Sequence, residues 1–213
     1  ALGYFGYDLA RRIEHLPSLA RDETGLPEMA IGLYDWALVV DHHRHSCCLV
    51  GQGRDPVTRK RWGRLLELLR QAPQVADDWS FRLEGELSSN LTPAAYGDAF
   101  RRIQRYIHEG DCYQVNLAQR FAVRAQGDPW SLYLELRRSN PAPFSAFLRM
   151  PWATVLSSSP ERFLQVHAGQ VETRPIKGTR PRGAEVEEDQ RMIRELRASA
   201  KDRAENLMIV DLL

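Results

Sequence analysis

The order in which strand-like and helix-like segments follow one another is the feature of this 213-residue sequence that most constrains its fold. Strand-like runs follow each other directly at 29–40 and 46–50, and again between residues 144 and 174, with helix-like runs separating these groups. A Rossmann or barrel fold requires a strict alternation of strands and helices. We therefore expect an α+β protein with mostly antiparallel sheets and helices packed outside them.

Amphipathic spacing and capping residues predict where the elements begin and end. Thr92 provides an N-cap and Pro93 a first-turn proline for a helix that Gly110 ends. By the same signals and by apolar spacing, helices are expected at 57–71, 92–110, 128–138 and from 185 onward. Besides 29–40 and 46–50, strands are expected at 81–87, 112–123, 144–150, 153–157, 162–166 and 171–174.

Charge and cysteine content exclude several classes of protein. The 29 Lys and Arg against 28 Asp and Glu give a net charge of +1, which argues against binding to nucleic acid or an anionic membrane. No apolar run reaches the length of about 20 residues that a membrane helix needs. The 3 cysteines form no CxxC pair, which is typical of a protein of the reducing cytoplasm.

The hairpin loop expected at 41–45 contains three histidines, which raise the alternative of a metal site. A polar hairpin tip explains them equally well. The two ends of the chain are also unusual, because Ala1 opens a strand-like run and residues 208–213 stop within an apolar run that has no helix cap. We expect this chain to be a piece of a longer protein that lacks both its N-terminal and its C-terminal parts.

Lys177 lies in the segment that most strongly indicates chemistry. Pro175 and Ile176 stiffen the approach to it, and Gly178 lets the backbone come close to a ligand. A lysine acts as a nucleophile only when it is neutral, and burial favours the neutral amine. A single lysine is more often a solvated surface charge, so the neighbours of Lys177 decide between the two interpretations.

Glu161 is the second residue of interest, because Pro160 fixes the turn that carries it. A partly buried carboxylic acid at such a place can act as a general acid, whereas a surface Glu161 would pair with Arg162. Glu161 precedes one strand of an expected hairpin and Lys177 follows the other. If the turn near Gly169 is tight, both residues lie at the same end of the hairpin and share one small site.

Glu205 stands where a polar helix segment gives way to an apolar one. A helix that is apolar all round is buried, so a carboxylate at its start is expected to be partly buried as well. Such a carboxylate needs a partner, and a Mg²⁺ ion held by one Glu needs a second carboxylate or an oxygen of the substrate.

Four segments in this order along the chain resemble the chorismate-utilising enzymes. They are GDCYQVNL at 110–117, SPERF at 159–163, PIKGT at 175–179 and DRAENLMIVD at 202–211. The resemblance covers nearly the whole chain and is strongest to the aminodeoxychorismate synthase branch, component I of para-aminobenzoate synthase. It implies part of the anthranilate-synthase-like fold, with residues 1–88 as the remainder of its N-terminal part and 89–213 as a truncated catalytic domain.

The resemblance also assigns roles to individual residues. Lys177 selects the branch, since anthranilate synthases usually have alanine there. Lys177 would attack ring carbon 2 of chorismate as the carbon 4 hydroxyl leaves, protonated by Glu161, and ammonia would then add at carbon 4 and expel the lysine. Gly178 and Thr179 correspond to the loop that lines the substrate, and Glu205 to a ligand of Mg²⁺.

The implied product is 4-amino-4-deoxychorismate, made by a transaminase-class transferase on the route to para-aminobenzoate and folate. The implied cofactor is Mg²⁺, and the implied partner is a glutaminase subunit that supplies ammonia. Residues 140–144 resemble half of a tryptophan pocket, so Pro143 and Phe144 are candidates for a regulatory or a structural role. Because a second Mg²⁺ carboxylate and a substrate-binding arginine of the family are absent, we expect the chain alone to be inactive.

Three alternatives stay open at this point. The first is another chorismate enzyme, an anthranilate synthase or an isochorismate or salicylate synthase, which should tolerate Lys177→Ala better. The second is a regulatory domain that keeps the fold without catalysis. The third is a lyase that forms a Schiff base on Lys177, which borohydride would trap.

Overall fold

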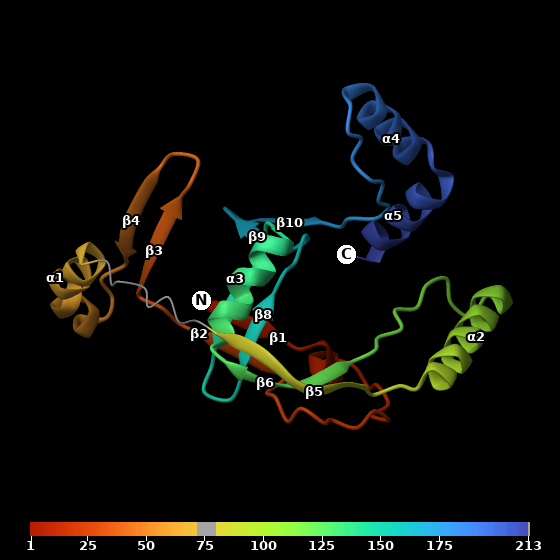
Figure 1. Ribbon diagram of the computed structural model, residues 1–213, viewed down its shortest axis with the longest axis horizontal. Coiled ribbons are helices and arrows are strands. Elements are labelled where there is room, and N and C mark those ends of the chain that lie inside the picture. The colour runs from red at the N-terminus through yellow and green to blue at the C-terminus, as the bar shows by residue number, and fades with distance from the viewer. Residues whose placement is uncertain (72–79, 213) are drawn as a thin grey trace. The chain divides into compact units, whose positions relative to one another are not determined.

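The computed structural model describes residues 1–71 and 80–212 (Figure 1). The chain divides into two compact units, one made of Ala1–Asp78 with Leu148–Val155 and the other of Trp79–Phe147 with Leu156–Leu213. Strands pair in antiparallel two-stranded ribbons and helices connect them, which confirms the predicted α+β class. The loop expected at 73–80 lies almost entirely outside the described residues, and the domain division predicted between residues 88 and 89 stays a prediction.

The first unit contains two ribbons and one long helix. Its elements are β1 (Leu2–Phe5), the 3-10 helix η1 (Tyr7–Arg12), β2 (Met29–Gly32), β3 (Trp36–Asp41), β4 (Ser46–Gly51) and α1 (Pro56–Arg70). The run at 29–40, predicted as one strand, is two strands that pair with different partners, β2 with β1 and β3 with β4. The Asp41 carboxylate accepts hydrogen bonds from two backbone N–H groups of the β3–β4 loop and thereby closes this hairpin.

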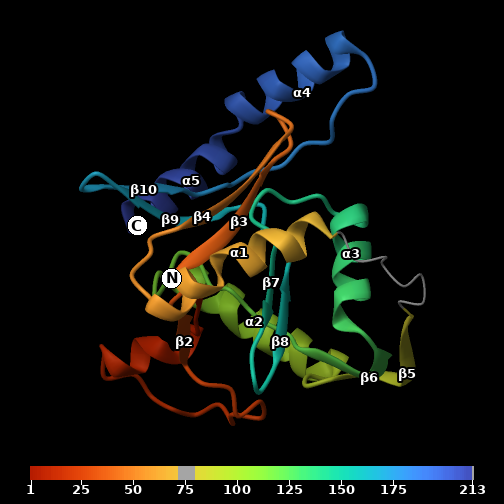
Figure 2. The same ribbon diagram turned by 90° about the vertical axis from the view of Figure 1, so that its left-hand side faces the viewer.

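The second unit carries every residue to which the sequence assigns chemistry. Its elements are β5 (Phe81–Ser89), α2 (Pro93–Glu109), β6 (Phe121–Gly127), α3 (Pro129–Ser139), β9 (Arg162–His167), β10 (Gln170–Arg174), α4 (Val186–Ala198) and α5 (Ala200–Leu212). The hairpin of β7 (Ala146–Arg149) and β8 (Thr154–Ser157), seen in Figure 2, begins and ends in this unit.

Helix boundaries follow the predicted caps. The Thr92 hydroxyl accepts a hydrogen bond from the Ala95 N–H at 3.1 Å, and Pro93 occupies the first turn of α2. Gly110 ends the helix with a φ of 83°, a left-handed conformation that glycine adopts without a steric penalty. Asp128 caps α3 in the same way, through the Trp130 N–H at 3.1 Å.

The strand predicted at 112–123 is wrong over most of its length. Pairing with β5 begins only where Asn90 and Arg120 exchange hydrogen bonds, and the regular strand β6 starts at Phe121. Residues 113–117 instead line a groove beside α2 and α5. Alternating β-branched residues favour a strand only where a neighbouring strand can pair with them.

The described residues bury few large apolar side chains. Tyr133 of α3 is 7% exposed and forms a cluster with Trp130 and Phe147, whose ring centroids lie 5.3 and 5.4 Å from that of Tyr133. The expectation that the apolar half of α5 is buried is wrong, because Leu207 is 70% exposed. In the described part of the chain, α5 contacts α4 and, at its first turn, the loop that follows β10, and these contacts leave Leu207 exposed.

Two further expectations concern metals and membranes. Among the described residues, no group of three or more His, Cys, Asp or Glu side chains is placed to hold a metal ion. The three cysteines are free thiols. None of the helices in 1–71 and 80–212 combines the length and the apolar character needed to cross a bilayer.

Candidate active site

The β9–β10 hairpin brings Glu161 and the segment before Lys177 to one end of a ribbon. The register pairs Gln170 with His167 and Arg174 with Arg162, so residue 161 lies opposite the residues that follow β10. The connection is tight because Ala168 and Gly169 both have positive φ values, 49° and 78°. The hairpin predicted from the sequence is therefore confirmed.

Glu161 is held on this side of the ribbon by two sets of hydrogen bonds. Its carboxylate Oε2 accepts from the Ile176 backbone N–H at 3.3 Å, one residue before Lys177. The Ser159 hydroxyl accepts from the Glu161 N–H at 3.3 Å and donates to the Glu161 carbonyl at 3.1 Å, which fixes the turn. The half-buried carboxylate is thus aimed at the backbone that presents Lys177.

Arg162 does not form the surface ion pair with Glu161 that was the alternative interpretation. Its guanidinium donates to the Glu172 carboxylate of the paired strand at 2.7 Å. Hydrogen bonds from Arg174 and Arg162 lower the pKa of Glu172, so this carboxylate is ionised over a wider pH range than an isolated one. The carboxylate of Glu161 is left to the Ile176 amide.

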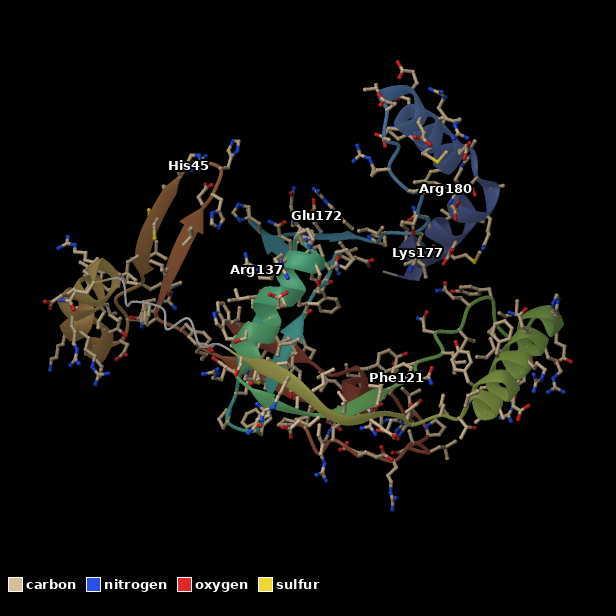
Figure 3. The ribbon with its side chains drawn as sticks, in the orientation of Figure 1. His45, Phe121, Arg137, Glu172, Lys177 and Arg180 are labelled. Carbon is tan, nitrogen blue, oxygen red and sulfur yellow. The ribbon has the colours of Figure 1, made fainter. Side chains whose placement is uncertain are left out.

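Lys177 is half-buried and follows Ile176 on the loop that leaves β10 (Figure 3). Within the part of the chain that the structure describes, no hydrogen bond or ion pair engages its ammonium group. The next residue, Gly178, has a φ of 74°, and a Cβ there would come within 2.8 Å of Leu196 Cδ1 and 2.9 Å of Asp202 Cβ. The lysine loop therefore lies directly against α4 and α5.

An ion pair ties the same loop to α5. Arg180 donates one hydrogen bond to the Thr179 carbonyl at 2.8 Å and another to the Asp202 carboxylate at 2.9 Å. The side chains of Arg180 and Asp202 are only 31% and 16% exposed. A hydrogen bond with the Ser199 hydroxyl, and then the Arg180 guanidinium, lower the pKa of Asp202. Neither Arg180 nor Asp202 had been singled out from the sequence.

Glu205 lines a groove to which neither Glu161 nor Lys177 contributes. This open groove of about 760 Å³ is also lined by Lys201 of the same helix, residues 113–117, and apolar side chains of α2. The Gln114 Oε1 atom is buried, with no hydrogen-bond partner in the described residues, although Gln114 had been assigned to a strand. Lys177 and Glu161 are not among the residues that line this groove, and Asp202, which lies against the lysine loop, is one helical turn from Glu205.

The surroundings of Glu205 fit a Mg²⁺ ion only in part. Glu205 is half-buried and supplies one carboxylate, while the nearest carboxylate along α5, Asp202, is taken by Arg180. Because Mg²⁺ is commonly held by one or two carboxylates together with oxygens of its substrate, one Glu is a compatible but incomplete set of ligands. Among the described residues that line the groove, Glu205 is the one carboxylate.

The predicted tryptophan-pocket segment is attached to the turn of Glu161. The Asn140 amide donates to the Ser158 hydroxyl at 3.0 Å, and the Phe144 N–H donates to the Ser159 carbonyl at 3.1 Å. The Arg162 guanidinium lies 5.5 Å from the centre of the Phe144 ring, while Pro143 is exposed. These contacts attach the segment to the turn that carries Glu161, and nothing among the described residues tests whether it binds tryptophan.

The chain was compared with known families and proteins. Residues 1–213 match the family described as chorismate binding enzyme. Over all 213 residues the chain is 51% identical to aminodeoxychorismate synthase component 1 of Escherichia coli (strain K12), covering 45% of that protein. Over 99% of its length it is 38% identical to anthranilate synthase component 1 of Thermus thermophilus, covering 46% of it.

A solved structure agrees with these sequence matches. Anthranilate synthase component I from Streptococcus pneumoniae superimposes with a TM-score of 0.82 at 27% identity, over 99% of this chain and 47% of that one. The chain therefore spans about half the length of the relatives that it matches. The resemblance found in the four motifs is confirmed across the whole chain.

Proposed function

This chain belongs to the family of chorismate binding enzymes, and on that premise we propose that it carries part of the active site of an enzyme that aminates chorismate to 4-amino-4-deoxychorismate. Ammonia is the nitrogen donor, and Lys177 forms a covalent intermediate. The observation that carries the proposal is the contact of the Glu161 carboxylate with the Ile176 N–H, because it sets an acid beside the segment that presents the lysine. The 51% identity to an aminodeoxychorismate synthase component supports the choice of branch.

The reaction consists of two displacements that exchange the carbon 4 hydroxyl for an amino group. In the first, the neutral Lys177 Nζ forms a bond to ring carbon 2, each of the two conjugated ring double bonds shifts by one position, and the carbon 4–oxygen bond breaks. Glu161 gives its proton to the departing oxygen, which leaves as water, because hydroxide is a poor leaving group at neutral pH. In the second, ammonia bonds to carbon 4, both double bonds shift back, the carbon 2–nitrogen bond breaks to release neutral Lys177, and the proton lost by the added ammonia returns to Glu161.

Other residues of the site bind and orient in this proposal. Glu205 would hold a Mg²⁺ ion, which when bound offsets the negative charge of the substrate carboxylates. The Gly178 backbone and Thr179 line the substrate next to the lysine. The relatives are named component 1, and we infer that a second component, a glutaminase, delivers the ammonia.

Anthranilate synthase is the second candidate function, because the 38% identity and the TM-score of 0.82 are both to enzymes of that name. The two activities can be separated by the product formed from chorismate, ammonia and Mg²⁺ by the full-length gene product. We expect 4-amino-4-deoxychorismate from the wild type and a loss of turnover in Lys177→Ala. Lys60→Ala, at an exposed position of α1, is the matched control and should keep the wild-type rate. Anthranilate as the product, insensitive to Lys177→Ala, would establish the second candidate instead.

A further inference from the structure

We propose that Arg180 and Asp202 are positioning residues, which fix the loop of Lys177 against α5 and thereby set the place of the lysine relative to Glu205. This inference rests on the proposed function, since it assigns to the pair a task in the chemistry of Lys177. The ion pair of Arg180 and Asp202 joins the loop that carries Lys177 to α5, the helix that presents the Glu205 carboxylate.

The contact is made by several groups at once. Arg180 uses one guanidinium nitrogen for the Thr179 carbonyl of its own loop and another for the Asp202 carboxylate of α5, at 2.8 and 2.9 Å. The Arg180 guanidinium therefore fixes both the backbone conformation of the loop and the distance of the loop from α5. Planar guanidinium groups suit such double recognition, which a lysine ammonium reproduces only as a point charge.

Close packing accompanies the ion pair. The backbone at Gly178 approaches α5 so closely that even a methyl group there would come within 2.9 Å of the Asp202 side chain. Asp202 is thus in van der Waals contact with the residue next to Lys177 while it receives the hydrogen bond from Arg180. The Asp202 backbone N–H donates a hydrogen bond to the Ser199 hydroxyl at 3.3 Å, which fixes the backbone of Asp202 in the first turn of α5.

The helix transmits this anchorage to Glu205. Residues three apart on a helix lie on neighbouring positions of one surface, so Asp202 and Glu205 form adjacent points on α5. The loop of Lys177 is attached at the first point, and the carboxylate proposed to hold Mg²⁺ is the second. A displacement of the loop by even about 1 Å would misalign a nucleophile and a bound substrate enough to slow the reaction by on the order of a hundredfold.

Most other ion pairs among the described residues are more exposed than Arg180–Asp202, and several lie within a single helix. Arg191 and Glu195 pair along α4 at 3.3 Å, but their side chains are 58% and 48% exposed and belong to one helix. Exposed pairs of this kind contribute little to structure or stability. Arg191→Gln is therefore a matched control, which removes a guanidinium from an ion pair without touching the loop.

The test measures kcat and KM for chorismate with ammonia and Mg²⁺ in the full-length gene product. The variants are Asp202→Asn, Arg180→Gln, the double variant, Arg180→Lys, and the control Arg191→Gln. We expect each single loss to lower kcat by on the order of tenfold to a hundredfold with a smaller change in KM. The double variant should lose no more than either single one, Arg180→Lys should recover part of the rate, and Arg191→Gln should match the wild type.

Thermal melting of each variant separates positioning from folding. A kcat that stays within twofold of wild type in Asp202→Asn, or a rate that falls only in proportion to the folded fraction, overturns the positioning role. Additive losses in the double variant overturn it as well. Failure of the proposed function would look different, because the wild-type protein itself would then form no 4-amino-4-deoxychorismate.

Discussion

The carboxylate of Glu161 and the backbone N–H of Ile176 lie 3.3 Å apart, although fifteen residues of a hairpin separate them in the sequence. The tight β9–β10 turn creates this proximity, and the Ser159 hydroxyl keeps the acid oriented. The arrangement places the proposed proton donor, Glu161, and the segment that carries the proposed nucleophile, Lys177, at one end of the same hairpin. Glu161 and Arg180 make different contacts, with the Ile176 N–H and with Asp202, so substitutions can test the effect of each side chain on activity separately.

Replacing Glu161 by Gln should separate its chemical role from its structural one. The amide oxygen can still accept the hydrogen bond from Ile176, so the hairpin end should keep its geometry, but the side chain can no longer donate a proton at neutral pH. We expect kcat for chorismate amination to fall by about 10²- to 10⁴-fold, the usual contribution of a general acid, with little change in melting temperature. The exposed Glu195→Gln on α4 is the control, and a kcat of Glu161→Gln within threefold of it would remove Glu161 from the mechanism.

Replacing Gly178 by Ala should show how tightly the lysine loop lies on α5. Gly169→Ala is the matched control, because Gly169 has a similar φ of 78° but nothing within 4 Å of the added methyl group. Both variants carry the strain of a positive φ, about 1 kcal/mol, and Gly178→Ala adds about 1–3 kcal/mol of overlap. A clearly lower melting temperature for Gly178→Ala than for Gly169→Ala is expected, and equal melting temperatures would show that the loop is not in contact with the helix.

Acidic pH should cancel the stabilisation that Asp202 provides. Its pKa is lowered in the folded protein by the Ser199 hydroxyl and by Arg180, so its contribution to stability is present above the unfolded-state pKa of about 4 and is lost as pH falls through the lower, folded-state value. The melting temperature of Asp202→Asn should therefore be below that of the wild type at neutral pH, with the two converging in acid. A gap that stays constant from pH 7 to pH 3 would contradict the ion pair.

The 213 residues expressed alone should be inactive. Among the described large apolar side chains, Tyr133 is the one that is buried, at 7% exposed, so the described part of the chain lacks the closely packed core on which a rigid site depends. We expect strong binding of an environment-sensitive dye such as ANS and no ammonia-dependent turnover of chorismate. Turnover at the rate of the full-length gene product would refute this expectation.

The sequence predicted local structure well wherever the signal was itself local. Thr92, Pro93 and Gly110 define a helix by capping chemistry alone, and the turn at Gly169 defines a hairpin whose register brings Glu161 toward Lys177. Both depend on residues that are close in the chain. This is why Glu161 and the neighbourhood of Lys177 could be identified before any coordinates.

Features that depend on distant neighbours were beyond such reasoning. The segment with Gln114 has the alternation of a strand, but it lies along a groove without a paired strand, and only tertiary structure decides between these outcomes. Asp202 and Arg180 are separated by 22 residues and carry no motif that links them. Gly178 is the one residue in the sequence that relates to this contact. A glycine is required there because the backbone lies so close to Asp202 of α5 that a side chain would overlap with it.

Covalent attachment of Lys177 to the substrate is the step on which the proposed function depends, and mass spectrometry of the full-length gene product can detect it. The protein is mixed with chorismate and Mg²⁺ without ammonia, quenched in acid after a short time, digested and mapped. We expect a peptide whose mass is increased by chorismate minus one water, with the modification on Lys177, and we expect this peptide to be absent in Lys177→Ala. An enzyme that turns over chorismate with ammonia but never carries the adduct on Lys177 would contradict it.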